Sequence, residues 1–151
     1  MAQATKNVKP IPEGYRTITP YLVVKGADKL IDFLKKAFGA EERFRMPGPN
    51  GTIAHAELKI GDSMLMTADG AREWQPMPSM IHLYVEDCDR FYKQAVDAGA
   101  SSVHTPELQF YGDRRAVVKD TFGNVWYMAT HVEDVSAEEM QQRMQTMAKA
   151  S

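Results

Sequence analysis

The chain carries one structural pattern twice, and this internal repeat constrains its fold more than any other feature. The segments YLVVKGADKLIDFLKKAFGA (21–40) and HLYVEDCDRFYKQAVDAGA (82–100) each read as a short β-rich run, an amphipathic helix and a closing Gly-Ala. Three positions of the two copies match at a constant offset of 61: Leu22 and Leu83, Val24 and Val85, Asp28 and Asp89. The sequence therefore predicts a duplicated supersecondary unit.

The boundaries of the two helices are predicted from caps and apolar spacing. Asp28 and Asp89 are expected to be the N-caps, and Gly39 and Gly99 to end the helices. Apolar residues recur at helical spacing in each segment: Leu30, Ile31, Leu34, Ala37 and Phe38 in the first, Phe91, Tyr92, Ala95 and Val96 in the second.

The repeat continues downstream of each helix. HAELKIGDSMLMTAD (55–69) parallels VVKDTFGNVWYMATH (117–131), with Gly61 on Gly123 and Met66 on Met128 at an offset of 62, and EERFRMP (41–47) and SSVHTPELQF (101–110) add one strand each. Each copy then reads βαβββ. The predicted fold class is α+β, with two tandem βαβββ modules forming a curved mixed sheet around a cup, plus a C-terminal helix.

This pattern gives one domain over residues 13–134, with module one at about 15–70 and module two at about 78–131. Residues 1–12, with Pro10 and Pro12, are expected to form a flexible arm. Ser136 and Glu139 make a capping box that starts a helix over 136–150, where methionines recur at 140, 144 and 147. We expect this helix to lie over the domain or against a dimer partner.

Composition excludes several classes of partner. The 151 residues are 44% hydrophobic, and 18 basic against 20 acidic residues give a net charge of −2 without a basic block. Nucleic acid and membrane surfaces are therefore not expected partners. With no signal segment or apolar run of about 20 residues, a cytoplasmic location is predicted. The single cysteine, Cys88, excludes an internal disulfide and is interpreted as a packing residue.

Strand alternation predicts which side chains face away from the helices. In IAHAELKI (53–60), Ala54, Ala56, Leu58 and Ile60 are assigned to the helix side, which leaves Ile53, His55, Glu57 and Lys59 on the open side. The same rule assigns to the open side Thr19, Tyr21, Val23, Met64, Met66, Met80, His82, Tyr84, Trp126, Met128 and Thr130. Such a lining suits a flat apolar or aromatic ligand oriented by two or three hydrogen bonds, although single methionines on a sheet face are often ordinary core.

Together these motifs resemble a known superfamily. TPYLVVKGADKLIDFLKKAFGA, HAELKIGDS, HLYVEDCD, QFYGDR and DTFGNVW are similar to segments of the vicinal oxygen chelate superfamily, which includes glyoxalase I, bleomycin-resistance proteins and extradiol dioxygenases. PEGY, HAEL, FYGDR and ATHVEDVS resemble the PhnB-like branch. The resemblance runs from about Pro12 to the capping box. It implies a cup-shaped site and a homodimer.

The resemblance also indicates where a metal would bind. Metal-dependent members use a histidine five positions before the valine that closes each first strand, which falls here on Thr19 and Met80. They use a carboxylate two positions after the aromatic residue of GxxW, which falls on Met128, with Met66 as its counterpart. Hydroxyl and thioether groups are poor ligands for the usual divalent ions. No metal is therefore expected at the usual positions, and no cofactor is predicted there.

Two alternatives stay open for the polar residues of the predicted cup. His55, Glu57 and His82 could orient a ligand, or they could form a shifted site for a divalent metal in a lyase, isomerase or dioxygenase, where they are also the catalytic candidates. Phe110, Tyr111 and Arg114 lie in a loop that could close over a ligand or simply form a turn.

The predicted function is binding of a small apolar or aromatic organic ligand, and whether turnover occurs is left open. A protein-interaction module is the third class. The predicted ligand-binding residues are Tyr21, His55, Glu57, Met66, Met80, His82, Tyr84, Phe110, Tyr111, Arg114, Trp126 and Met128.

Overall fold

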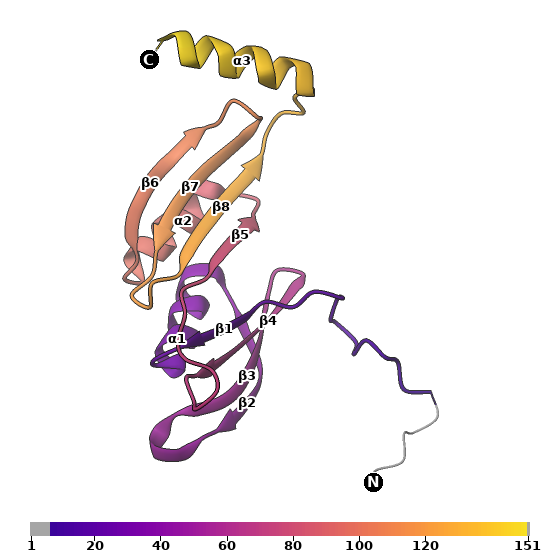
Figure 1. Ribbon diagram of the computed structural model, residues 1–151, viewed down its shortest axis with the longest axis vertical. Coiled ribbons are helices and arrows are strands. Elements are labelled where there is room, and N and C mark those ends of the chain that lie inside the picture. Colours follow the sequence, from indigo (N-terminus) through magenta and orange to yellow (C-terminus); the bar gives the residue numbers. More distant parts are fainter. Residues whose placement is uncertain (1–6, 151) are drawn as a thin grey trace. The chain divides into compact units, whose positions relative to one another are not determined.

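The computed structural model describes residues 7–150, which form two compact units (Figure 1). The first contains the residues up to Lys35 together with Gly39–Met77, and the second contains Lys36–Phe38 and the residues from Pro78 onward. Of the predicted arm at 1–12, residues 1–6 lie outside the described part of the chain. No helix within residues 7–150 combines the length and apolar character needed to cross a bilayer.

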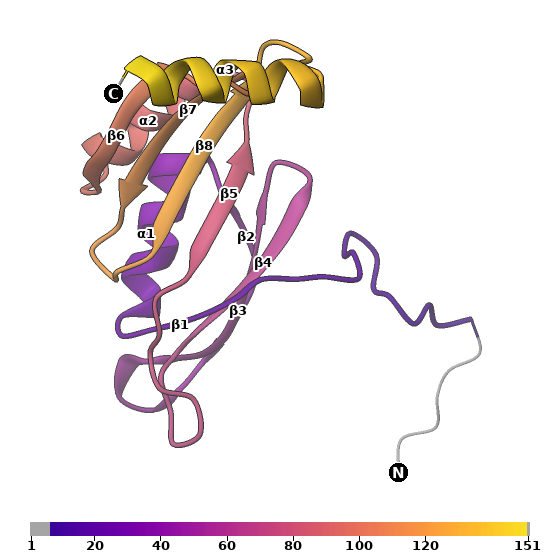
Figure 2. The ribbon, with the colours of Figure 1, turned by 45° about the horizontal axis from the view of Figure 1, so that its top comes forward.

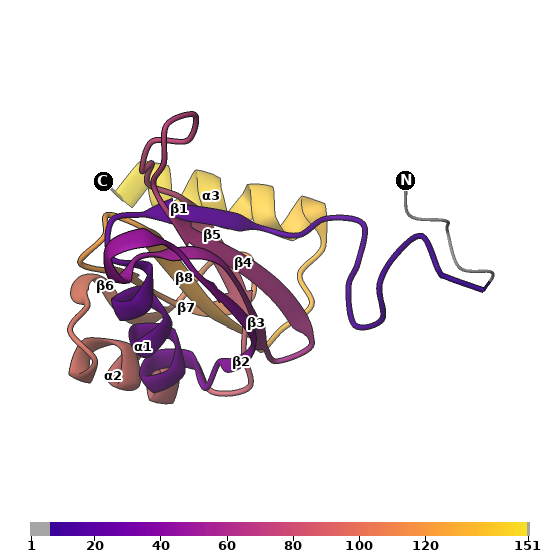
Figure 3. The same cartoon turned by 90° about the horizontal axis from the view of Figure 1, so that it is seen from below.

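The first βαβββ module is a four-stranded mixed sheet with one helix, of which the last residues, Lys36–Phe38, are grouped with the second unit. Its elements are β1 (Tyr21–Val24), α1 (Ala27–Phe38), β2 (Glu41–Pro47), a short 3₁₀ turn (Pro49–Gly51), β3 (Ile53–Ile60) and β4 (Ser63–Asp69). The strand order is β1-β4-β3-β2, with β1 and β4 parallel and the other pairs antiparallel. Figure 3 shows α1 on one side of this sheet.

The second unit repeats this topology. It contains β5 (Met80–Tyr84), α2 (Cys88–Asp97), β6 (Ser101–Leu108), β7 (Asp113–Lys119) and β8 (Val125–His131), in the order β5-β8-β7-β6. The α+β class, with two βαβββ modules and a C-terminal helix, is confirmed. That helix, α3 (Ala137–Ala150), lies beyond the end of β8 (Figures 1 and 2). It begins where the Ser136 hydroxyl accepts the Glu139 N–H at 3.1 Å.

The apolar stripe of α1 is confirmed, because Leu30, Ile31, Leu34, Ala37 and Phe38 are all buried. The predicted apolar stripe of α2 is only partly confirmed. Ala95 is fully buried, whereas Val96 is exposed and Phe91 and Tyr92 are half-buried. Cys88 is buried, with its thiol 3.3 Å from the Met128 carbonyl oxygen, and burial raises the pKa of the thiol, as expected of a packing residue.

Both predicted N-caps, Asp28 and Asp89, were wrong by two positions. The N-cap of α1 is Gly26 in a left-handed conformation, so Asp28 lies inside the first turn, and the Asp69 carboxylate accepts the N–H groups of Gly26 and Ala27 instead. Asp87 caps α2 by accepting the Arg90 N–H. Asp89 pairs with Arg114. The helices begin sooner after the strands than the acidic residues suggested. Gly39, with positive φ, ends α1 as predicted, and α2 ends at Asp97, just before Gly99.

The register of the final strand corrects a second prediction. Tyr21 pairs with Met66 in the first sheet, and His82 pairs with Tyr127 in the second, so the strand residues keep the offset of 61. The counterpart of Met66 is Tyr127 and not Met128. Since successive strand residues point to opposite faces, this shift of one position turns Trp126, Met128 and Thr130 to the helix side. Trp126 and Met128 are 0% exposed.

A smaller irregularity affects the start of β3. Alternation holds from His55 to Ile60, but Ile53 is buried and Ala54 is exposed, the reverse of the prediction. The ladder with β2 shifts register between Met46 and Pro47. The extra residue inverts the pattern before the shift and leaves it correct after it.

Candidate functional site

The face of each sheet that does not carry its helix is called here the open face. On the open face of the first sheet there is a hollow of about 510 Å³. Glu57 of β3, Met66 of β4 and Thr19, just before β1, line it on the sheet side. Its other walls come from the segment that precedes β1, namely Pro10, Ile11, Pro12, Tyr15, Arg16 and Thr17. The hollow is thus mostly apolar and contains one acidic and one basic side chain.

A hydrogen-bond chain fixes the carboxylate of the hollow. The Tyr21 hydroxyl lies 2.9 Å from His55 Nδ1, and His55 Nε2 lies 3.2 Å from Glu57 Oε2. Burial raises the pKa of the Tyr21 phenol, so it remains protonated near neutral pH and can donate to Nδ1. In the tautomer that accepts this bond, the ring proton is on Nε2 and can be donated to Glu57. Within residues 7–150, Glu57 Oε1 has no hydrogen-bond partner and is available to a ligand.

Two further side chains complete this neighbourhood. The ring of Phe44, on β2, lies 6.2 Å from the His55 ring between centroids, and Phe44 pairs with Glu57 in the ladder, so it shares the open face. The Tyr15 hydroxyl is buried and has no hydrogen-bond partner among residues 7–150. Buried polar groups are normally paired, so an unpaired phenol in the wall of a hollow marks a position where a bound molecule or water can bond.

The open face of the second sheet carries a row of aromatic rings. His82 stacks on Tyr127, with centroids 5.9 Å apart, and contacts Tyr84 at 4.8 Å. Met80 and Tyr84 are 67% and 68% exposed. The guanidinium carbon of Arg115 lies 5.4 Å from the Tyr127 ring centroid. His82 is therefore a ring-stacking residue of this face.

A second polar chain lies at one end of this face. Asp113 is buried and accepts a hydrogen bond from the Tyr84 hydroxyl at 3.0 Å, and its other oxygen lies 2.7 Å from His131 Nδ1. His131 Nε2 lies 2.6 Å from Asp134. The two carboxylates, Asp134 first and then Asp113, raise the pKa of His131. The hydrogen bond to Asp113 likewise raises the pKa of Tyr84, with a smaller contribution from burial.

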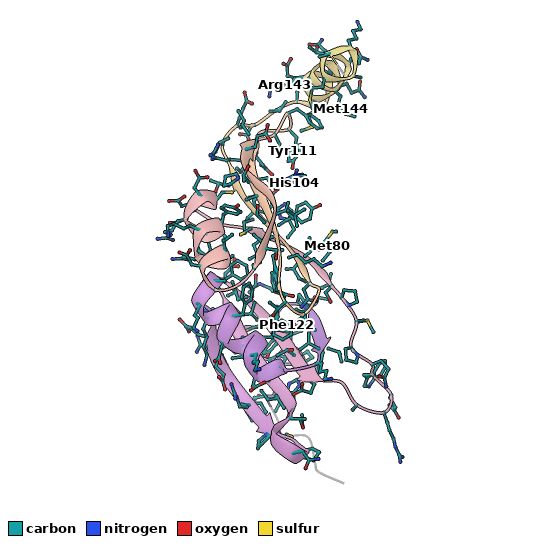
Figure 4. All side chains as sticks on the ribbon, turned by 90° about the vertical axis from the view of Figure 1, so that its left-hand side faces the viewer. Met80, His104, Tyr111, Phe122, Arg143 and Met144 are labelled. Atoms are coloured by element: carbon teal, nitrogen blue, oxygen red, sulfur yellow. The ribbon has the colours of Figure 1, made fainter. Side chains whose placement is uncertain are left out.

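The predicted ligand-closing loop is occupied by internal contacts. Phe110 and Tyr111 pack edge to face, and the Phe110 carbonyl oxygen accepts a hydrogen bond from Arg143 of α3 at 3.0 Å. Figure 4 shows Arg143 on α3 close to the end of the sheet that holds Tyr111. Arg114 faces the helix side, where it makes a two-point ion pair with Asp89 at 2.7 and 3.0 Å. The sequence placed Arg114 in the loop, whereas it is the second residue of β7.

The four positions that match the metal ligands of the family have different surroundings. Thr19 and Met66 line the hollow, Met80 is exposed on the second sheet, and Met128 is buried on the helix side. Of the shifted set, His55 and Glu57 are in contact, while His82 belongs to the other unit. Across residues 7–150 no group of three His, Cys, Asp or Glu side chains is arranged to hold a metal ion.

Comparison with known proteins identifies the family. Residues 16–128 match the sequence model of the Glyoxalase/Bleomycin resistance protein/Dioxygenase superfamily. The chain belongs to this superfamily. Relatives in mycobacteria are uncharacterised proteins: one of Mycobacterium bovis is 38% identical over 149 residues, covering 91% of this chain and 94% of that protein. One of Mycobacterium tuberculosis is 38% identical over 91% of this chain and 84% of its own length.

Solved structures share the fold of this chain. TioX from Micromonospora sp. ML1 matches with a TM-score of 0.66 and 24% identity over 78% of this chain and 99% of that chain. The fosfomycin resistance protein FosX from Mesorhizobium loti matches with a TM-score of 0.57 and 15% identity over 83% and 97% of the two chains. At these sequence identities, the likeness shows a shared fold and nothing about function.

Several residues of the two open faces are absent from the predicted site, among them Tyr15, Asp113, Arg115 and Tyr127. Alternation with the correct register would have found Tyr127, because it is the strand partner of His82. The same rule applied to DRRAVVK (113–119) would have put Asp113 and Arg115 on one face. Tyr15 carries no comparable signal, since it lies in irregular chain before β1.

Proposed function

We propose that this protein binds a small apolar or aromatic organic molecule that carries a hydrogen-bond donor, and that it binds it in the hollow of the first unit. The observation that carries the proposal is the fixed carboxylate of Glu57 in an otherwise apolar lining. A hollow of about 510 Å³ is within the size range of sites for small organic ligands.

The chemistry of the lining selects the ligand class. Met66, Ile11 and the two prolines offer apolar contact, and a thioether adapts to ligands of different outline. Glu57 accepts a hydrogen bond but cannot donate one when ionised, so the ligand group opposite it must be a donor such as a phenol, an alcohol or an amine. The unpaired Tyr15 hydroxyl supplies a second polar contact.

Family membership supports a role in small-molecule recognition. The superfamily description includes bleomycin resistance proteins, and one structural relative is named as a fosfomycin resistance protein. Within the superfamily we infer a place in the PhnB-like branch, because PEGY, HAEL, FYGDR and ATHVEDVS resemble its motifs. We also infer a homodimer by analogy with the family.

A matched pair of ligands tests the proposal. 4-Ethylphenol and ethylbenzene have the same apolar body, but only the phenol can donate to Glu57. Titrations followed by ligand-observed NMR should give binding of 4-ethylphenol that is about tenfold tighter, the worth of one hydrogen bond to a charged group. Equal affinities, or no binding of either compound at millimolar concentration, would contradict the proposal.

Matched variants locate the ligand. Glu57→Gln should remove most of the preference for the phenol, and Met66→Ala should weaken both ligands. Met64→Ala is the control, because Met64 shares β4 and the open face with Met66 but does not line the hollow. If Met64→Ala weakens binding as much as Met66→Ala does, the ligand lies elsewhere on the sheet.

The same samples test the metal-dependent alternative. Dialysed protein is titrated with Zn²⁺, Ni²⁺ and Mn²⁺ while its melting temperature is followed, because a metal that prefers the folded state raises that temperature. Near-stoichiometric metal binding that His55→Ala abolishes would favour a metal enzyme over simple ligand capture. Gain of ligand affinity on deletion of α3 would favour the third class, a face filled by a protein segment.

A further inference from the structure

Arg115 occupies an unusual position on the open face of the second sheet. Its guanidinium carbon lies 5.4 Å from the centroid of the Tyr127 ring, and Tyr127 stacks with His82 on the same face. Arg114, the preceding residue of β7, points to the helix side, where it bonds to Asp89. Alternation along β7 thus separates two neighbouring arginines onto opposite faces of the sheet.

Unlike Arg114 and Arg143, Arg115 has no carboxylate partner within the described residues. Arg114 is paired with Asp89, and Arg143 is paired with Glu133 and Glu139. Among residues 7–150, no carboxylate oxygen lies within 4.0 Å of the Arg115 guanidinium. Its polar contact is a long one, 3.3 Å from Nη1 to the Tyr111 hydroxyl, and its buried Nε has no hydrogen-bond partner in the described part of the chain.

An unpaired guanidinium beside aromatic rings favours one kind of ligand. Arginine presents its N–H donors at the edge of a planar group, and a carboxylate can accept two of them at once. The Tyr127 ring lies beside the guanidinium, whose carbon is 5.4 Å from the ring centroid, and the polar contact with Tyr111 uses only Nη1. The remaining N–H donors can make such a contact. The neighbouring rings of His82 and Tyr84 are exposed and can stack on an aromatic ligand.

We propose that Arg115, together with the rings of Tyr127, His82 and Tyr84, forms a binding site for small planar aromatic carboxylates. The carboxylate accepts hydrogen bonds from Arg115, after a small rotation that brings Nε to the ligand, while the ring of the ligand lies on His82 and Tyr84. The site uses residues of the second unit alone. This proposal can therefore be tested independently of the proposed ligand site in the hollow around Glu57.

The carboxylate of Glu107 opposes the binding of an anion at this site. It is the ladder partner of Arg115 across β6 and β7, so the two side chains share a face, yet they form no ion pair. A bound anion lies close to this carboxylate and is repelled by it. Removing the charge of Glu107 must therefore tighten binding, an effect opposite in sign to that of removing Arg115.

The test is a titration of the full-length protein with 2-naphthoate, 2-naphthamide and acetate, followed by protein-observed NMR. 2-Naphthoate should bind at least about tenfold tighter than the neutral amide, because hydrogen bonds to a charged group are the stronger ones. It should also bind tighter than acetate, which lacks the ring. Equal binding of naphthoate and naphthamide, equal binding of naphthoate and acetate, or no binding at millimolar concentration overturns the proposal.

Variants assign the site to its residues. Arg115→Gln should lower the affinity for 2-naphthoate about tenfold, and Glu107→Gln should raise it. Arg90→Gln is the matched control and should change nothing, since Arg90 also lies over a ring, that of Phe91 on α2, at 5.1 Å. Should Arg115→Gln fail to fold, His82→Ala serves instead, because this exposed ring can be removed without opening the core. Unchanged affinity in either folded variant refutes the site, whereas 4-ethylphenol binding to the first unit should not respond.

Discussion

Asp69 caps a helix that begins 42 positions earlier in the chain: its Oδ1 accepts the main-chain N–H of Ala27 at 3.1 Å. The second unit has the same arrangement with a different residue, since the Thr130 hydroxyl accepts the Cys88 N–H across the same separation of 42 positions. In each unit the end of the last strand thus fixes the start of the helix.

Replacing Asp69 by Ala should therefore destabilise the protein by roughly 2 to 3 kcal/mol, measured by urea unfolding, because hydrogen bonds to charged groups contribute about 1.5 to 3 kcal/mol. Besides Gly26 and Ala27, the N–H of Ile53 also loses its acceptor. Asp28→Ala is the control and should cost less than about 0.5 kcal/mol, because Asp28 is not the cap. Similar losses in the two variants would show that the capping role is misassigned.

Asp69 also predicts a loss of stability in acid. Burial raises its pKa, but the three main-chain donors outweigh burial and leave the pKa below its ordinary value. A lowered folded-state pKa means that the stabilisation is present above the ordinary pKa of about 4 and is lost as pH falls through the folded value. Urea unfolding between pH 6 and pH 3 should show a shallower decline for Asp69→Asn than for the wild type. Parallel declines would contradict this.

Met66 and Met128 should respond to truncation in different ways. Met128 is fully buried on the helix side, so Met128→Ala should cost about 2 to 4 kcal/mol of unfolding free energy. Met66 is half-buried at the hollow. Met66→Ala should therefore cost less unfolding free energy, but it should lower the affinity for 4-ethylphenol. Folded Met128→Ala protein should keep wild-type affinity. If Met128→Ala lost affinity for 4-ethylphenol while its stability stayed unchanged, the Met128 side chain would lie on the open face and not on the helix side.

Gly112 should tolerate no side chain. Its φ of +98° is unfavourable for other residues, and a Cβ there would overlap the carbonyl oxygen of Glu133. Gly112→Ala should therefore destabilise by about 2 kcal/mol or more, combining backbone strain with overlap. Gly99→Ala isolates the strain, because φ there is +113° and no atom lies within 4 Å of the added Cβ. Equal costs for the two would mean that the β8–α3 connection shifts freely.

The contacts of His131 predict a loss of stability as the pH rises above about 6.5. The carboxylates of Asp134 and Asp113 raise its pKa, so its contribution is present in full below the ordinary pKa of about 6.5 and is lost as pH rises through the raised value. The melting temperature should fall over this range in the wild type and fall less in His131→Gln. His104→Gln, an exposed histidine on β6, should behave like the wild type. A His131→Gln profile parallel to the wild type would refute this role.

Strand and helix order could be predicted from the sequence, because the repeat and the apolar periodicities report local geometry. Alternation alone misassigns the sheet face on which the Trp126 side chain lies, because that face depends on the length of the preceding loop. Ile60 and Ser63 close a tight turn between β3 and β4, whereas Lys119 and Val125 flank a longer loop between β7 and β8. The loop glycines Gly61 and Gly123 still match, but the strand that follows is displaced by one position.

The longer loop also contains a signal that could have corrected the facing. The Asp120 carboxylate accepts hydrogen bonds from Phe122 N, Asn124 N, Asn124 Nδ2 and Trp126 Nε1. A buried indole needs an acceptor, and an aspartate six positions earlier in a turn provides one on the helix side. The Tyr21–His55–Glu57 contact, by contrast, joins two strands, and only the observed pairing brings the hydroxyl to the imidazole.

The parallel pairing of the first and last strand of each module has a consequence for synthesis on the ribosome. The Thr67 hydroxyl donates to the Leu22 carbonyl and the Thr130 hydroxyl to the Val85 carbonyl, each across 45 positions. At about 5 to 20 residues per second, the first strand of a module waits roughly 2 to 9 s for its partner to be translated. During that time its edge is unpaired and open to chaperones or to other nascent chains, and each module meets this exposure once.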